Sequence, residues 1–467
     1  GVLSIYSYSK EGVLMSRIFL LLSLLFSGQA LSAGTDKAPP AFNLSRGEGK
    51  AVFVDFTKAT YSVSYNVKTR SASARTEVQF NVVDAGFPIF DLVPEISKIW
   101  LDGELVSSAS LTLPDSASKV RYIKKAVATG KHTMVIENSL SKNVSFSSGK
   151  SVKSAYWMSD LSDRRYLEQY LPTNLEFDQY KMELKISVVG SDLEHRIYSN
   201  GSVTELSRNN FEVVTPDYFT ASSFFFHLTP VGAFKELKTV FTSIDGRKLP
   251  IEIYSSSSNL SSFKKKTLST LRELEADYGP FPHQKIVIYG AGSGGMEYCG
   301  ATMTSLWALS HELTHSYFAR GIMPARGNAG WVDEAIASWR DDGYPQANRS
   351  RLNRTRMAGH SIYRRTTDRA AYSSGAKFMA YLDGKFENQG GLKKFLKEFK
   401  DTRLFDPFLT GEFEKALEQY FNTSLKEDFA TYIYGASGIE QASEEKLKGL
   451  ENPYHPKLSQ SELFNLL

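Results

Sequence analysis

The chain has 467 residues, of which 42% are hydrophobic and 23% are charged, as is typical of soluble globular proteins. This composition excludes a largely disordered chain, a collagen and a multi-span membrane protein. The net charge of +4 is small, and no dense Lys/Arg tract with interleaved aromatics occurs, so no nucleic-acid partner is expected. With Cys299 as the single cysteine, no intramolecular disulfide and no cysteine-based zinc finger can form.

The N-terminal region has the pattern of a secretory signal peptide over residues 15–33. Arg17 precedes the apolar run 18–26, and small residues follow up to Ala33. A run of nine residues is too short to cross a hydrocarbon core of ~30 Å, so no stable membrane insertion is expected after cleavage. We therefore expect a secreted or periplasmic protein, with residues 1–14 as an upstream extension of the signal.

Residues 41–237 alternate apolar and polar side chains over short stretches that are separated by Gly, Ser, Asn and Asp. Examples of this alternation are residues 61–67, 76–83 and 180–188. A period of two predicts strands with one buried face, and the frequent turns predict an all-β, sandwich-like domain.

Residues 238–435 begin with mixed structure and then become mostly helical. Strands are expected over 248–254 and 285–289, with a helix over 264–278 between them. Further helices are expected over 306–320, 331–340, 375–386, 392–399, 411–421 and 425–434. Strands that give way to a run of helices indicate an α+β multidomain protein. The polar tail, 436–467, carries little structural signal.

Three residues have the spacing of a metal site. His311 and His315 stand four apart in the helix expected over 306–320, so both imidazoles lie on one face and can reach one ion. We expect this helix to end near Arg320, with Gly321 in the left-handed position after it. Glu334 follows His315 after eighteen intervening residues, and a helix–loop–helix of this size can return its carboxylate to the ion. Two His, one Glu and an open position for water are typical of catalytic zinc.

These motifs resemble those of a known family. The spacing of His311, Glu312, His315 and Glu334 is the gluzincin pattern. Gly294-Gly-Met-Glu-Tyr298 is similar to the Gly-x-Met-Glu-Asn motif of the alanyl-aminopeptidase/leukotriene-hydrolase family, and residues 371–382 resemble its Tyr-Glu-Lys-Gly segment. Residues 171–173 and the strand after them resemble the stretch that ends the family's β domain.

The resemblance implies a thermolysin-like, mostly helical zinc peptidase domain after the β domain, with one Zn²⁺ per chain. It implies that His311, His315 and Glu334 bind the zinc, while Glu312 is the general base and Tyr372 donates a hydrogen bond in the transition state. It also implies that Glu297 binds the free α-ammonium of a peptide, with Gly294, Gly295 and Met296 supporting the bound chain.

The sequence departs from the family pattern in three respects. Tyr298 replaces the usual Asn. A second amine anchor is expected in the β domain, where Asp163 has the best spacing from Leu171, with Asp160 and Glu168 as alternatives. The large C-terminal helical domain of long family members is expected to be absent, which would leave a less covered cleft.

These observations predict an exported zinc aminopeptidase that acts on peptides with a free N-terminus through a zinc-activated water. The alternatives are a gluzincin endopeptidase or a glycyl aminopeptidase with an open cleft, or a catalytically inactive secreted peptide-binding protein. The sequence does not indicate an oligomeric state.

A basic stretch precedes Tyr372 and contains the arginines 349, 351, 354, 356, 364, 365 and 369. We interpret these arginines as solvated helix faces, with the binding of substrate carboxylates by one or two of them as the alternative.

Overall fold

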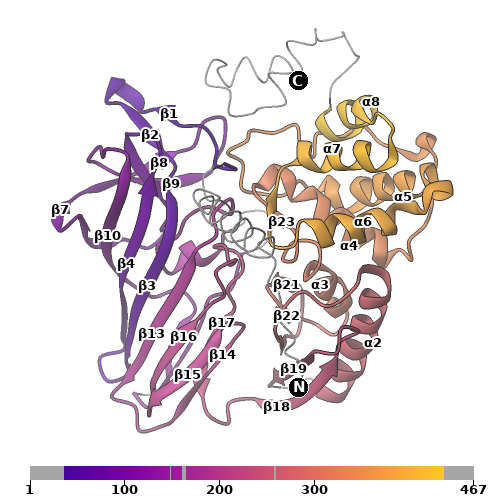
Figure 1. Ribbon diagram of the computed structural model, residues 1–467. Helices are drawn as coiled ribbons and strands as arrows, with labels where there is room; N and C mark the ends of the chain where they lie inside the picture. Colours follow the sequence, from indigo (N-terminus) through magenta and orange to yellow (C-terminus); the bar gives the residue numbers. More distant parts are fainter. Residues whose placement is uncertain (1–35, 148, 160–164, 257–258, 436–467) are drawn as a thin grey trace, which may run out of the picture.

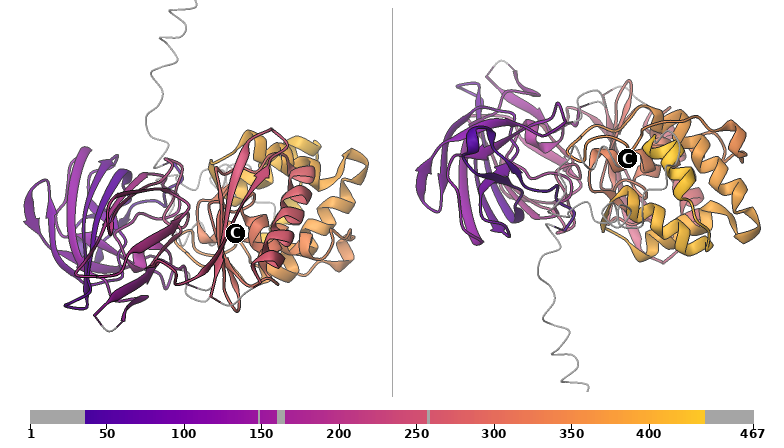
Figure 2. Two further views of the ribbon diagram at one scale, coloured as in Figure 1. Left: turned by 90° about the horizontal axis from the view of Figure 1, so that it is seen from below. Right: turned by 90° about the horizontal axis from the view of Figure 1, so that it is seen from above.

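The computed structural model describes residues 36–147, 149–159, 165–256 and 259–435 (Figure 1). The predicted signal peptide, the polar tail and Asp163 lie outside the described residues. Figures 1 and 2 show a β-rich part and a mostly helical part side by side. The predicted α+β organisation, with the strands first, is confirmed. Among the described residues, none of the helices is both long and apolar enough to cross a membrane.

Over its described residues, the β-rich part contains three sheets. The largest has the strand order β15 (Ser202–Ser207), β16 (Asn210–Val214), β13 (Lys181–Val189), β3 (Asp55–Asn66), β4 (Ser71–Val82), β10 (Gly130–Ser139), β6 (Ile96–Leu101) and β7 (Glu104–Val106). The second has the order β1 (Phe42–Asn43), β2 (Lys50–Val52), β5 (Phe87–Phe90), β9 (Lys119–Ile123) and β8 (Ser108–Thr112). The third has the order β11 (Val144–Ser147), β12 (Ser151–Ala155), β17 (Phe226–Pro230) and β14 (His195–Ser199).

The alternation of apolar and polar residues in the sequence corresponds to an alternation of buried and exposed side chains in the large sheet. Along β4, every second side chain from Ala72 to Val82 is buried. Successive residues of a strand point to opposite faces, so this pattern places one face of the sheet against the core. The C-terminal ends of β3, β4 and β13 match the three predicted examples to within one residue, whereas β3 and β4 begin six and five residues earlier than predicted.

The second part opens with a mixed sheet in the order β18 (Lys235–Thr242), β19 (Lys248–Ser255), β20 (Ile286–Gly290), β22 (Ala301–Thr304) and β21 (Gly295–Tyr298). The helices are α2 (Leu260–Tyr278), α3 (Leu309–His315), α4 (Trp331–Asp341), α5 (Ala376–Lys385), α6 (Gly391–Thr402), α7 (Thr410–Phe421) and α8 (Lys426–Phe429). A two-stranded pair, β23 (Met323–Pro324) and β24 (Pro407–Phe408), links the α3–α4 connection to the α6–α7 connection.

Trp331 lies at the centre of the helical core. Its indole is fully buried against the rings of Phe378, Phe413 and Phe429, and its Nε1 donates to Oγ1 of Thr410 at 3.2 Å. These contacts fix the first turn of α4, which carries Glu334. The helical core therefore determines where that carboxylate lies.

The two parts share a buried apolar cluster. It contains Met158, Tyr166, Tyr198, Ala221 and Phe225 from the β-rich part, with Tyr254, Val287, Tyr298 and Ala301 from the second part. The hydroxyl of Tyr298, which stands at the position of the family's Asn, accepts a hydrogen bond from the backbone N of Met158 at 3.0 Å. Strand β21 is thus held against the β-rich part.

Candidate metal centre

Helix α3, which carries the two histidines, is shorter than the sequence predicts. It spans Leu309–His315 instead of 306–320. Before it, Nζ of Lys266 binds the carbonyl oxygens of Leu306 and Trp307 at 2.8 and 3.0 Å, which stabilises a turn there. After it, the backbone changes to hydrogen bonds between residues three apart, such as Tyr317 N to Thr314 O at 3.0 Å. The prediction of a long helix was wrong at both ends.

The expectation for Gly321 was also wrong. Its φ angle lies outside the left-handed region, so it is not a left-handed residue after the helix. Glycine is needed there for another reason, since a Cβ atom at this position would lie 2.6 Å from the carbonyl oxygen of Tyr317. The chain therefore turns back closely on the end of the histidine segment.

The three residues with metal-site spacing lie together. Oε2 of Glu334 is 3.4 Å from Nε2 of His311 and 3.3 Å from Nε2 of His315. The three candidate ligand atoms are all within 4.8 Å of one another. Helices α3 and α4 pack against each other, and this packing brings the carboxylate to the imidazoles.

Asp341, which the sequence analysis missed, orients one of the histidines. Its Oδ2 accepts a hydrogen bond from Nδ1 of His311 at 2.7 Å, which leaves Nε2 of that ring facing Glu334. On the other histidine, Nδ1 of His315 lies 3.4 Å from the carbonyl oxygen of Phe318 and 3.7 Å from Asp333. Asp341 lies seven residues, or two turns, after Glu334, so the helical period could have indicated it.

Glu312 is buried beside the histidines and lies directly against Gly295 of strand β21. A Cβ atom on Gly295 would be 2.1 Å from Oε1 of Glu312, so only glycine allows this approach. Burial, with a smaller contribution from the nearby Glu297, raises the pKa of Glu312 to about 8. Gly294 has a φ angle of 71° and is exposed, with open space around it.

Glu297 lies at the inner end of strand β21, opposite Thr302 in β22. Its side chain is buried, and candidate ligand atoms of Glu297, Glu312 and His315 lie within 4.8 Å of one another. Oε1 of Glu297 accepts a hydrogen bond from Nη2 of Arg320 at 2.9 Å. Met296, the neighbouring residue, is partly buried against the apolar cluster between the two parts.

Tyr372 lies beside His311. It lies in a π-helical turn, Ala371–Gly375, that leads into α5, and its ring is nearly parallel to that of His311 with 6.3 Å between the centroids. Single π turns are common at functional sites. A Cβ atom on Gly375 would lie 2.7 Å from Cβ of Ala335, so glycine allows this turn to pack closely on α4.

The candidates for a second amine anchor lie in two different situations. Asp163 and Asp160 are outside the described residues. Glu168 is fully buried, and its Oε1 binds Arg365, which also binds Asp91. Burial raises the pKa of Glu168 above its usual range. The interpretation of Arg365 as part of a solvated helix face was therefore wrong, because it joins the helical part to two buried carboxylates of the β-rich part.

The residues at the site fit a divalent cation. Two imidazoles and a carboxylate are preferred zinc donors. Glu297, Glu312 and Glu334 are each at most 6% exposed, and burying such charges without cations is costly. Burial alone would lower the pKa of His315, but the carboxylate of Glu334 raises it overall. The same negative surroundings would favour a bound Zn²⁺.

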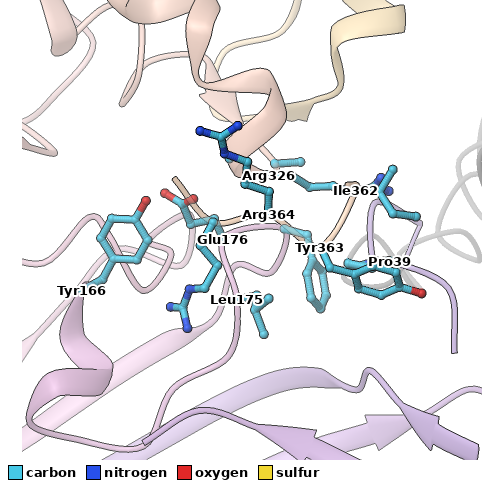
Figure 3. Close-up of a pocket in the computed structure, with 12 residues that line it drawn as sticks. Pro39, Tyr166, Leu175, Glu176, Arg326, Ile362, Tyr363 and Arg364 are labelled. Atoms are coloured by element: carbon cyan, nitrogen blue, oxygen red, sulfur yellow. The ribbon is translucent and has the colours of Figure 1, made fainter. Parts of the chain in front are cut away.

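A separate pocket lies elsewhere between the two parts (Figure 3). Its free space amounts to about 330 Å³ when the adjoining open solvent is included. Its lining includes Tyr166, Glu176, Arg326, Tyr363 and Arg364, and none of the residues predicted to bind zinc or to act in catalysis. Arg326 donates to the carbonyl oxygen of Lys37, and Arg364 donates to Thr366 and Asp368, so these guanidinium groups are engaged within the protein.

The sequence matches no protein-family model and no curated protein. Several solved structures are similar. A variant of the M1 zinc metallopeptidase from Deinococcus radiodurans is 13% identical with a TM-score of 0.57, over 83% of this chain and 95% of that chain. Leukotriene A4 hydrolase from Saccharomyces cerevisiae is 12% identical with a TM-score of 0.60, over 95% and 78%.

Aminopeptidase A from Legionella pneumophila is also similar, at 14% identity and a TM-score of 0.58, over 84% of this chain and 51% of that chain. All three similarities extend across the β-rich and the helical parts. The resemblance seen in the sequence motifs is therefore confirmed in the fold. The chain has the fold of the M1 zinc metallopeptidases.

Proposed function

We propose that this protein is a zinc-dependent aminopeptidase that removes N-terminal residues from peptides. The observation that carries the proposal is the position of Glu297, whose carboxylate is buried beside Glu312 and the candidate zinc ligand His315. A carboxylate at this place can bind the α-ammonium of a peptide and so bring the first peptide bond to the metal. Two similar structures support this proposal: the Deinococcus radiodurans enzyme was solved with the peptide Tyr-Ser-Ala bound, and a two-domain M1 zinc metallopeptidase was solved with the amino acid L-arginine bound.

His311, His315 and Glu334 would hold one Zn²⁺ per chain, with Asp341 orienting the first of them. A bound zinc ion polarises the scissile carbonyl and lowers the pKa of water. Glu312 takes the proton of the attacking water and transfers it to the leaving nitrogen, as a general base and then a general acid.

The remaining residues bind and orient the substrate. Tyr372 donates a hydrogen bond from its hydroxyl to the oxyanion that develops on the carbonyl oxygen, which stabilises the transition state more than the substrate. Glu297 binds the free amine, and the backbone of Gly294, Gly295 and Met296 supports the peptide. Because β21 is an edge strand, its outer side pairs with no other strand among the described residues.

The proposal includes export, which rests on the signal-peptide pattern of residues 15–33. The mature protein would then act outside the cytoplasm, as a secreted or periplasmic enzyme. Expression of the full chain with and without this segment, followed by fractionation of the cells, tests this part of the proposal.

The activity is tested with a set of peptides prepared in matched free and N-acetylated forms. The purified protein, loaded with one equivalent of Zn²⁺, is incubated with both sets, and the products are identified by mass spectrometry. Glu312→Gln serves as the background control, because it keeps the shape of the general base and removes its proton transfer.

Loss of single N-terminal residues from the free peptides alone is the expected result. Internal cleavage of both sets would instead establish an endopeptidase with an open cleft. Cleavage restricted to N-terminal glycine would establish a glycyl aminopeptidase. If neither set is cut while zinc is bound, the protein is a peptide-binding protein and the proposal fails.

A further inference from the structure

Arg320 forms a buried ion pair with the proposed amine anchor. Its Nη2 lies 2.9 Å from Oε1 of Glu297, and both side chains are only 4% exposed. Arg320 is five residues beyond His315, and its backbone N donates to the carbonyl oxygen of His315 at 3.0 Å. The side chain of Arg320 therefore extends from the chain just after helix α3 to the edge strand β21.

Two residues of the β-rich part also contact this guanidinium. Nη1 donates to Oγ of Ser222, and Nη2 lies 3.9 Å from Sδ of Met158. Ser222 and Met158 are both buried. Arg320 is thus fixed by contacts with Met158, Ser222 and Glu297. Because its guanidinium is planar and its donors have fixed directions, these contacts also orient the Glu297 carboxylate.

We infer that Arg320 is a positioning residue that holds the Glu297 carboxylate in the orientation that binds the free α-ammonium of a peptide. The inference rests on the proposed function. It adds that the selectivity of the aminopeptidase for a free N-terminus depends on Arg320.

The chemistry of the pair is consistent with this role. A carboxylate has two oxygens with about four acceptor positions, so one carboxylate can bind a guanidinium and an ammonium group at the same time. A side chain held by a charged hydrogen bond loses less freedom when a ligand binds, which strengthens binding. Without Arg320, Glu297 could turn away from the substrate, and the buried carboxylates Glu297 and Glu312 would lose a nearby positive charge.

The test compares Arg320→Gln, Arg320→Lys and Ser222→Ala with the wild-type protein. For each, kcat and KM are measured with one free peptide, and bound zinc is determined by elemental analysis. Calorimetry with L-leucinamide and its N-acetyl derivative measures amine binding independently of turnover. Loss of a hydrogen bond to a charged group predicts a rise in KM and Kd of about tenfold to a hundredfold for the free amine in Arg320→Gln.

Zinc content and binding of the acetylated compounds should stay as in the wild type. Arg320→Lys should recover part of the affinity, because an ammonium can replace one of the two hydrogen bonds. Ser222→Ala, which keeps all charges, should shift KM in the same direction by a smaller factor. It also provides a test if Arg320→Gln does not fold.

The inference is overturned if free and acetylated compounds lose affinity equally, if zinc is lost, or if KM is unchanged in all three variants. Failure of the proposed function appears elsewhere, in the wild-type protein, as cleavage that does not depend on a free N-terminus. The two failures are therefore distinguishable in one set of measurements.

Discussion

Oδ2 of Asp341 lies 2.7 Å from Nδ1 of His311, so a carboxylate at the end of α4 fixes the ring of a candidate zinc ligand in α3. Such partners set the tautomer and the orientation of a ligating histidine. We predict that Asp341→Asn weakens zinc binding by about tenfold to a hundredfold. Competition with a chromophoric chelator measures this change.

Asp342→Asn is the matched control, because it removes the same charge from the neighbouring residue, which is exposed. It should leave zinc affinity unchanged. Equal weakening in both variants would mean that general electrostatics, and not the contact with His311, controls the affinity.

Gly295→Ala should separate zinc binding from catalysis. The added Cβ would meet Oε1 of Glu312 at 2.1 Å, so either the general base or strand β21 must move. A misplaced catalytic group costs on the order of a hundredfold in rate. We therefore predict a loss of kcat of about that size with zinc content unchanged, measured by steady-state kinetics and elemental analysis.

Gly292→Ala serves as the control for this substitution. No atom of the described residues lies within 4 Å of a Cβ at Gly292, and its φ angle is outside the left-handed region. Activity close to that of the wild type is expected. If Gly295→Ala is equally active, the contact with Glu312 has no catalytic role.

Arg365 should contribute strongly to stability, because it pairs with two buried carboxylates of the other part of the chain, Asp91 and Glu168. Removing one member of a buried ion pair leaves an uncompensated charge and typically costs about 3–5 kcal/mol. We predict that Arg365→Met lowers the free energy of unfolding by this amount, measured by urea denaturation.

The comparison variant is Arg364→Met, which removes a partly exposed arginine that pairs with Asp368 at 3.5 Å. Its cost should be below ~1 kcal/mol, as for other solvent-screened pairs. Similar losses in the two variants would contradict the importance of burial at Arg365.

Because of the buried His227, we predict that the folded protein loses stability in mild acid. Burial, with a smaller effect from Lys153, lowers its pKa from 6.5 to about 3. Below the unfolded value of 6.5 the unfolded chain binds a proton that the folded protein does not, so folded-state stability falls until the pH reaches the folded pKa. The expected decrease in the free energy of unfolding is about 1.4 kcal/mol per pH unit.

Urea denaturation at about pH 7 and about pH 5 measures this decrease. His227→Phe keeps an aromatic ring beside Trp157 and Tyr254 and removes the titrating group. Between the two pH values the wild type should lose about 2 kcal/mol more than the variant. Parallel pH dependence in both proteins would show that other groups control acid stability.

The features that the sequence predicted well are those with a local cause. Helix α4 was expected over 331–340 and is observed over Trp331–Asp341, because its apolar face repeats with the helical period. The placement of Glu334 followed from it. The His311–His315 spacing likewise depends on only one turn of helix.

The features that the sequence did not predict have partners far away in the chain. Arg365 pairs with Asp91 across 274 positions, and Arg320 binds Ser222 across 98. Strands β21 and β22 are only four residues long each, and the Gly-rich segment 290–295 at the start of β21 indicates a loop. They become strands because β22 pairs with β20, and tertiary pairing overrides weak local preference.

The contacts of Arg320 show that the metal ligands and the amine anchor are held in different ways. The candidate zinc ligands all lie between His311 and Glu334, so the helical part contains everything needed to capture the ion. The orientation of Glu297 additionally depends on Met158 and Ser222, which belong to the half of the chain that is synthesised first. We therefore expect metal binding to need contacts within the second part of the chain, whereas recognition of an N-terminus needs both parts in contact.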